Sequence, residues 1–176
     1  MVTSMGFENP ERISRVMVVG THSLLPPLPE GEDSGDGDGG EAARELTLDS
    51  VRAAMEALLV NRSIITPELV RTVFDTRRWM SARPRAAARD NRVQADRSAE
   101  RQKGVPLWRR LDQIPVPLLM MYGINDRPTT ARRLGLLRDL YPSLDLRVLQ
   151  RCGHVVQWDA ADEFIAAAGG FFNGLQ

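Results

Sequence analysis

The stretch that decides the fold reads VPLLMMYGINDR at residues 116–127, followed by LDLRVL at 144–149 and RCGH at 151–154. An apolar run that ends in Gly and precedes an acid is typical of a buried parallel strand with a carboxylate just past its C-terminal end. Asp126 is that carboxylate. A helix-length segment leads to a second strand that ends before His154, and the right-handed crossover between parallel strands brings both strand ends to one edge of the sheet. We therefore expect Asp126 and His154 to lie together, as the last two members of a triad in the chain order Ser, Asp, His.

The composition indicates a single domain. The chain has 176 residues, of which 43% are hydrophobic and 26% charged, and its formal net charge is zero; this is ordinary for one globular domain. No apolar stretch reaches the roughly 20 residues of a membrane span, and the first residues lack a secretory pattern, so we expect a cytoplasmic protein without a membrane partner. Cys152 is the only cysteine and there are two histidines, which argues against a disulfide and against a metal or other cofactor.

The charges are unevenly distributed along the chain. Residues 30–49 contain eight acidic residues and one arginine, whereas residues 71–110 contain twelve basic and four acidic residues. Blocks of opposite sign in one chain can neutralise each other, and no motif combines aromatic with basic residues. We therefore expect no nucleic-acid partner.

N-terminal to residues 116–154, the first predicted element is a strand at residues 15–20, RVMVVG. His22 follows it, and we interpret this residue as solvated or structural, with a catalytic role as the less favoured alternative. Residues 24–45 contain Pro-Pro followed by an alternation of acidic residues with Gly at 31–40, which favours a flexible loop over a calcium-binding loop. Helical patterns follow, with Thr47 or Asp49 as one N-cap and Thr66 as the next.

The rest of the chain completes an α/β pattern. Residues 77–103 are rich in Arg and Ala and indicate either a surface helix or partial disorder, and residues 106–111 indicate a short helix. After Asp126 we expect a helix capped by Thr129 or Thr130, and after His154 a final helix capped by Asp159. The predicted fold is α/β, with three parallel strands, flanking helices and a helical insertion after the first strand.

Three segments together resemble the C-terminal half of α/β-hydrolases, most closely the ester and carbon–carbon bond hydrolases that include the meta-cleavage-product hydrolases. They read NPERISRVMVVG at 9–20, YGINDR at 122–127 and RCGHVVQWD at 151–159. The resemblance implies a partial α/β-hydrolase core at residues 1–23 and 112–176, a flexible acidic loop at 24–45 and a helical lid at 46–111. It also implies that His154 is general base and then general acid, while Asp126 fixes its tautomer and stabilises the imidazolium.

The resemblance places the nucleophile at Ser4 and an oxyanion-hole donor at Met5. The sequence TSMG at 3–6 contains the second half of a G-x-S-x-G elbow, but Val2 stands where the first glycine belongs. Only four residues separate Ser4 from the segment at 9–20, where the family has a helix, so we expect a chain truncated at its N-terminus.

Two further departures concern the substrate. Val73 stands at the place of the lid arginine of the carbon–carbon hydrolases, with Arg71 or Arg77 as substitutes, and Val155 stands where a tryptophan usually follows the catalytic histidine.

The expected function is hydrolysis of an ester or carbon–carbon bond in a small organic substrate by Ser-Asp-His chemistry, without a cofactor and impaired in this chain. The alternative is a non-catalytic interaction protein. Without its neighbouring strands, the strand at 15–20 would present an unpaired edge through which the chain could form homo-oligomers.

Overall fold

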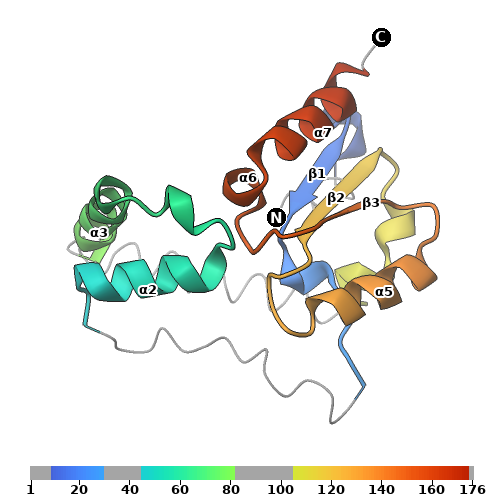
Figure 1. Cartoon of the computed structure of the whole chain (residues 1–176). Coiled ribbons are helices and arrows are strands. Elements are labelled where there is room, and N and C mark those ends of the chain that lie inside the picture. The colour runs from blue at the N-terminus through green and yellow to red at the C-terminus, as the bar shows by residue number, and fades with distance from the viewer. Residues whose placement is uncertain (1–8, 30–44, 82–104, 175–176) are drawn as a thin grey trace.

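The described part of the chain is built on a three-stranded parallel sheet. A computed structural model describes residues 9–29, 45–81 and 105–174 (Figure 1). The strands are β1 (Val16–Val19), β2 (Leu118–Gly123) and β3 (Asp145–Leu149), in the order β1-β2-β3. In the register, Val16 pairs with Leu118 and Leu119 pairs with Asp145. The expected α/β class with three parallel strands is therefore confirmed.

The central strand β2 is buried along its whole length because helices cover both faces of the sheet. Helix α5 (Thr130–Leu140) connects β2 to β3 on one face, and α6 (Val156–Asp159) and α7 (Ala161–Asn173) follow β3 on the other (Figure 1). Since successive strand residues point to opposite faces, β2 contributes to two cores. One contains Met120, Tyr122, Leu134 and Leu137, and the other contains Leu119, Met121, Val156 and Phe171.

A pair of helices, α2 (Leu48–Leu58) and α3 (Pro67–Ser81), forms a third core beside the sheet (Figure 1). Val51, Met55, Leu59, Ile65 and Val70 are buried in it. Both helices begin where the sequence predicts. The Thr47 Oγ1 atom accepts a hydrogen bond from the Ser50 amide at 3.0 Å, and Thr66 Oγ1 accepts one from the Leu69 amide at 3.2 Å. The predicted helical pair is confirmed.

The connecting segments differ from the predicted ones in detail. Short 3₁₀ turns occur at Pro10–Arg12, His22–Leu24, Arg62–Ile64, Leu107–Arg109 and Leu111–Gln113. The last two replace the single helix expected at 106–111. Leu24 and Leu25, at the start of the expected flexible loop, are buried in the core that includes Met120; residues 30–44 and 82–104 lie outside the described residues.

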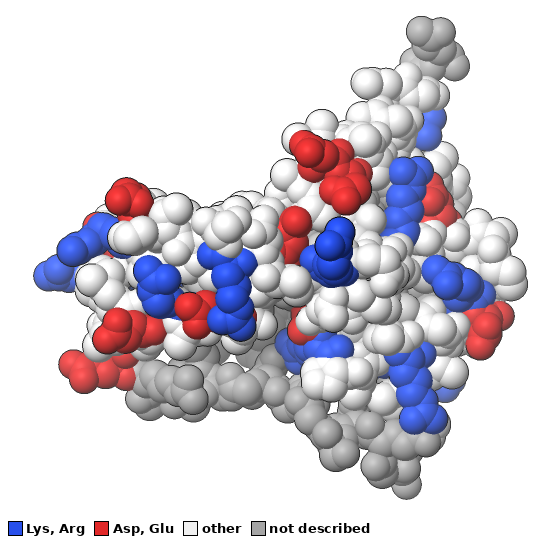
Figure 2. Space-filling view, in the orientation of Figure 1, with Lys and Arg blue, Asp and Glu red and all other residues white. Residues whose placement is uncertain are grey.

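Opposite charges are mixed on the surface that Figure 2 shows. Basic and acidic side chains lie beside one another over both the α2–α3 pair and the sheet with its helices (Figure 2). Among the described residues, no helix is both long enough and apolar enough to cross a membrane.

Candidate active site

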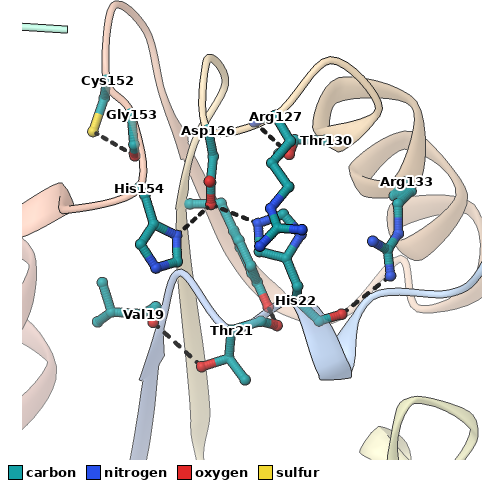
Figure 3. Close-up of polar contacts among 11 residues, drawn as sticks. Val19, Thr21, His22, Asp126, Arg127, Thr130, Arg133, Cys152, Gly153 and His154 are labelled. Carbon is teal, nitrogen blue, oxygen red and sulfur yellow. Dashed lines mark hydrogen bonds and ion pairs between the residues drawn. The ribbon is translucent and has the colours of Figure 1, made fainter. Parts of the chain in front are cut away.

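The loops after β2 and β3 bring Asp126 and His154 into contact. The Asn125 amide donates to the Cys152 carbonyl at 2.9 Å and the Ile124 amide donates to the Leu149 carbonyl at 3.0 Å, so the two loops are joined through their backbones. His154 Nδ1 donates to Asp126 Oδ2 at 2.9 Å (Figure 3). The two side chains thus lie side by side, as the crossover between parallel strands predicts.

A second histidine contacts the same carboxylate oxygen. His22 follows β1, and its Nε2 donates to Asp126 Oδ2 at 2.7 Å (Figure 3). The interpretation of His22 as a solvated or structural loop residue therefore missed a member of the site. Because His22 follows a third parallel strand, the sequence places it at this edge of the sheet, but it does not reveal the contact with Asp126, which depends on where the loop after β1 turns.

The backbone around His22 is held by hydrogen bonds from β2 and α5. Arg133 of α5 donates from Nη2 to the carbonyls of His22 and Leu25, both at 3.1 Å, and from Nε to the Pro26 carbonyl at 2.9 Å. The Tyr122 hydroxyl donates to the Thr21 carbonyl at 2.9 Å. Since Tyr122 is buried in the sheet core, the turn that carries His22 is fixed from both sides.

The loop that carries His154 is fixed by Asp159 and by the end of α2. The Gly153 amide donates to Asp159 Oδ2 at 2.6 Å, and the His154 amide donates to the Leu58 carbonyl at 2.8 Å. Asp159 also accepts from the amides of Val60 and Asn61. Asp159 was expected to cap the final helix, but α7 begins after Ala160 without a side-chain cap, because the carboxylate is already occupied by these three amides.

Several glycines pack closely against the His154 loop, Gly153 and Gly20 among them. A Cβ atom on Gly153 would overlap the Leu58 carbonyl oxygen. Gly20, at the end of β1, has a φ of 60° and would place a Cβ atom 2.9 Å from the His154 carbonyl oxygen. The close approach of these backbones sets the position of the imidazole.

The electrostatic environment keeps Asp126 ionised. Burial raises the pKa of its carboxyl, but hydrogen bonds from His22 and then from His154, with the charges of these two groups, lower the pKa further, so the net pKa lies below its ordinary value. The Asp126 side chain is 2% exposed, while those of His22 and His154 are 15% and 37% exposed. The carboxylate is therefore buried, and the His154 imidazole reaches solvent.

The candidate nucleophile Ser4 and the candidate oxyanion donor Met5 lie outside the described residues. Cys152 is next to the site in sequence, but it is fully buried, and burial, followed by the charges of Asp159, Glu163 and Asp126, raises its pKa to about 12. Its thiol is therefore protonated at neutral pH and is a poor nucleophile.

A shallow hollow of about 270 Å³ lies between the C-terminal end of α2 and the loops that carry Asp126 and His154. Its lining includes Leu58, Val60, Arg62, Asn125 and Gly153. Asn125 and Gly153, the sequence neighbours of Asp126 and His154, line the hollow, whereas Asp126, His154 and His22 do not.

Comparison with known proteins connects this arrangement to hydrolases. The chain is 32% identical over 163 residues to 2-hydroxy-6-oxononadienedioate/2-hydroxy-6-oxononatrienedioate hydrolase 2 of Pseudomonas putida, an alignment that covers 89% of this chain and 53% of that protein. The 2-hydroxy-6-oxononadienedioate/2-hydroxy-6-oxononatrienedioate hydrolase 1 of Dechloromonas aromatica is 29% identical over 163 residues, which cover 89% and 52% of the two chains.

Solved structures show the same fold. A meta-cleavage product hydrolase from Pseudomonas fluorescens superposes with a TM-score of 0.64 at 21% identity, covering 99% of this chain and 61% of that one. The 2-hydroxy-6-oxo-6-phenylhexa-2,4-dienoate hydrolase of a Rhodococcus strain gives 0.58 at 19% identity, with 97% and 59% covered. The chain therefore has the α/β-hydrolase fold. It spans about half the length of the curated relatives it matches, and no protein-family model matches it.

Proposed function

We propose that this chain acts on an ester or carbon–carbon bond of a small organic substrate, with Asp126 and His154 as acid and base of a catalytic triad. The observation that carries the proposal is the hydrogen bond from His154 Nδ1 to the buried Asp126 carboxylate. The relatives support the substrate class, since they are named as hydrolases of 2-hydroxy-6-oxo-dienedioates.

The geometry explains how His154 can move a proton. Because Nδ1 carries the hydrogen that Asp126 accepts, the lone pair of the neutral ring is on Nε2. That nitrogen can take the proton of an attacking hydroxyl and later pass it to the leaving group. The carboxylate of Asp126 stabilises the imidazolium between these two transfers, and its lowered pKa keeps it charged at neutral pH.

The remaining parts of the proposed site are the nucleophile, its oxyanion donor and a lid. We assign the nucleophile to Ser4 and one oxyanion donor to the Met5 amide, on the TSMG sequence alone. The helical pair is assigned as the lid, supported by the hydrogen bond from the His154 amide to the Leu58 carbonyl and by the hollow at that junction. We expect slow turnover because Val2 replaces the first glycine of the elbow.

The experiment is hydrolysis of p-nitrophenyl acetate, and of a 2-hydroxy-6-oxo-dienoate, by the purified chain and its variants. His154→Ala and Ser4→Ala should each lower kcat/KM by about 100-fold or more. Ser143→Ala, at an exposed position after α5, is the matched control and should leave the rate unchanged. Equal rates for all four proteins would refute the proposal.

A second candidate function, an interaction protein that assembles through its sheet, is favoured by one observation. Within residues 9–29, 45–81 and 105–174, β1 pairs with β2 on one side only. An open strand edge is a template for another strand, and a chain that stays monomeric at high concentration would argue against this role.

A further inference from the structure

The chain's two histidines point at one carboxylate oxygen. His22 Nε2 and His154 Nδ1 lie 2.7 Å and 2.9 Å from Asp126 Oδ2, and all three atoms lie within 4.8 Å of one another. We propose that these three atoms bind a divalent transition metal ion, with Zn²⁺ as the best-suited ion and an open coordination position toward solvent.

The donor set matches zinc. Imidazole nitrogen and carboxylate oxygen are zinc ligands, and zinc sites with three protein ligands keep a fourth position for water or a ligand. The exposed fraction of the His154 side chain provides that opening, because the other two side chains are largely buried. When both imidazoles are neutral, the three ligands together carry one negative charge. This charge favours the binding of a divalent cation.

The carboxylate oxygen would need to move only a short distance from the two ring nitrogens. Zinc bonds of about 2.0–2.2 Å in tetrahedral geometry separate ligand atoms by roughly 3.4 Å. The carboxylate oxygen would therefore withdraw from each ring nitrogen by about half an ångström as the metal enters between them. Both ring nitrogens already face this point, so neither imidazole has to turn over (Figure 3).

The ligands are also held in place by the surrounding residues. Arg133 and Tyr122 fix the turn of His22, and the Leu58 carbonyl fixes the His154 backbone.

Metal binding and the proposed hydrolysis exclude each other. With a metal on Nδ1, neutral His154 carries its hydrogen on Nε2 and cannot accept a proton from a nucleophile. Zinc should therefore inhibit turnover reversibly, and EDTA should restore it. This consequence rests on the proposed function, whereas the binding itself does not.

Calorimetric titration of the EDTA-treated and dialysed chain with ZnCl₂ at pH 7.5 tests the site. We expect one ion per chain with a Kd of about 10 µM or lower. His22→Ala and Asp126→Asn should weaken binding at least about 10-fold. Asp112→Asn, an exposed carboxylate away from the site, is the control and should bind normally. Zinc binding that is unchanged in His22→Ala would overturn the assignment, since the ion would then be bound elsewhere, for example by the acidic residues within 30–44.

A second measurement needs no variant. Because the chain has only two histidines, ¹³C-labelled imidazoles give two sets of ring signals, and one equivalent of Zn²⁺ should shift both. Zinc binding that leaves either set unmoved would refute the three-ligand site. Esterase activity without zinc binding would refute this inference alone, and zinc binding without esterase activity would refute the proposed function alone.

Discussion

At the scale of single residues, the main feature is one carboxylate oxygen that accepts two imidazole hydrogens. Hydrogen bonds to charged groups contribute about 1.5–3 kcal/mol each, and the lowered pKa of Asp126 shows that they outweigh its burial. The same oxygen accepts from His154, the proposed general base, and from His22, whose ring is largely buried.

Asp126→Asn tests this balance through the pH dependence of stability. The folded pKa of Asp126 lies below its unfolded value of about 3.9, so its stabilising contribution is fully present above the unfolded pKa and is lost as the pH falls through the folded one. At pH 7 the variant should lose about 1–3 kcal/mol of unfolding free energy. Urea denaturation between pH 3 and pH 7 should show this gap closing toward pH 3; a gap of constant size would contradict the assignment.

The sequence could predict two of the three residues at this site. Asp126 and His154 each follow an apolar strand signal, and a single crossover relates them. His22 is 104 positions from Asp126, and its contact depends on where the loop after β1 turns. That turn is set by Arg133 and Tyr122, neither of which has a local pattern that indicates such a role.

At the scale of elements, Asp159 joins the helical pair to the His154 loop. Its carboxylate accepts from the amides of Gly153, Val60 and Asn61 at 2.6–3.1 Å. This side chain, at the end of α6, therefore couples the segment after α2 to the loop that carries His154.

Asp159→Ala should loosen this junction without unfolding the sheet. The variant leaves three amides without their acceptor. Because water can reach the exposed amides of Val60 and Asn61, the loss should be only about 0.5–1.5 kcal/mol, and hydrogen exchange at Val60 and Asn61 should accelerate while exchange in β2 stays slow. Asp162→Ala, exposed on α7, is the control. Equal exchange at Val60 in both variants would contradict the role given to Asp159.

Helices and strands with a clear periodicity of apolar residues were predicted well, and the segments that connect them were predicted less well. The three strands and helices α2 and α3 follow from apolar patterns and caps, since these signals are local. Asp159 was taken for a helix cap because an acid before an apolar run is the usual cap signal. Its partners, Val60 and Asn61, are almost a hundred positions away, and a local pattern cannot show them.

At the scale of the whole molecule, β1 has an open side. The amides of Val16 and Gly20 donate to β2, at the Pro117 and Met121 carbonyls. Because alternate amides of a strand face opposite sides, the amides of Met17 and Val19 point toward that open edge, away from the rest of the described sheet.

If the open edge pairs with a second copy, assembly should depend on concentration. Light scattering after size-exclusion chromatography should show a dimer of the wild type that dissociates on dilution. Met17→Pro removes one outward donor and should stay monomeric, with circular dichroism verifying that it is folded. In the wild-type chain, hydrogen exchange at the amides of Met17 and Val19 should slow as the protein concentration is raised. Exchange rates that do not change with concentration would contradict pairing at this edge.

The pairing of β1 with β2 also has a consequence for how the protein is made. During translation, residues 16–19 leave the ribosome while their partners at 118–121 are still about a hundred codons away. The sheet therefore cannot close until most of the polypeptide has been synthesised, and such distant contacts form slowly. Throughout that interval the apolar segment of β1 is exposed and can form non-native contacts. We therefore expect the yield of folded protein to depend on chaperones and on the rate of translation elongation.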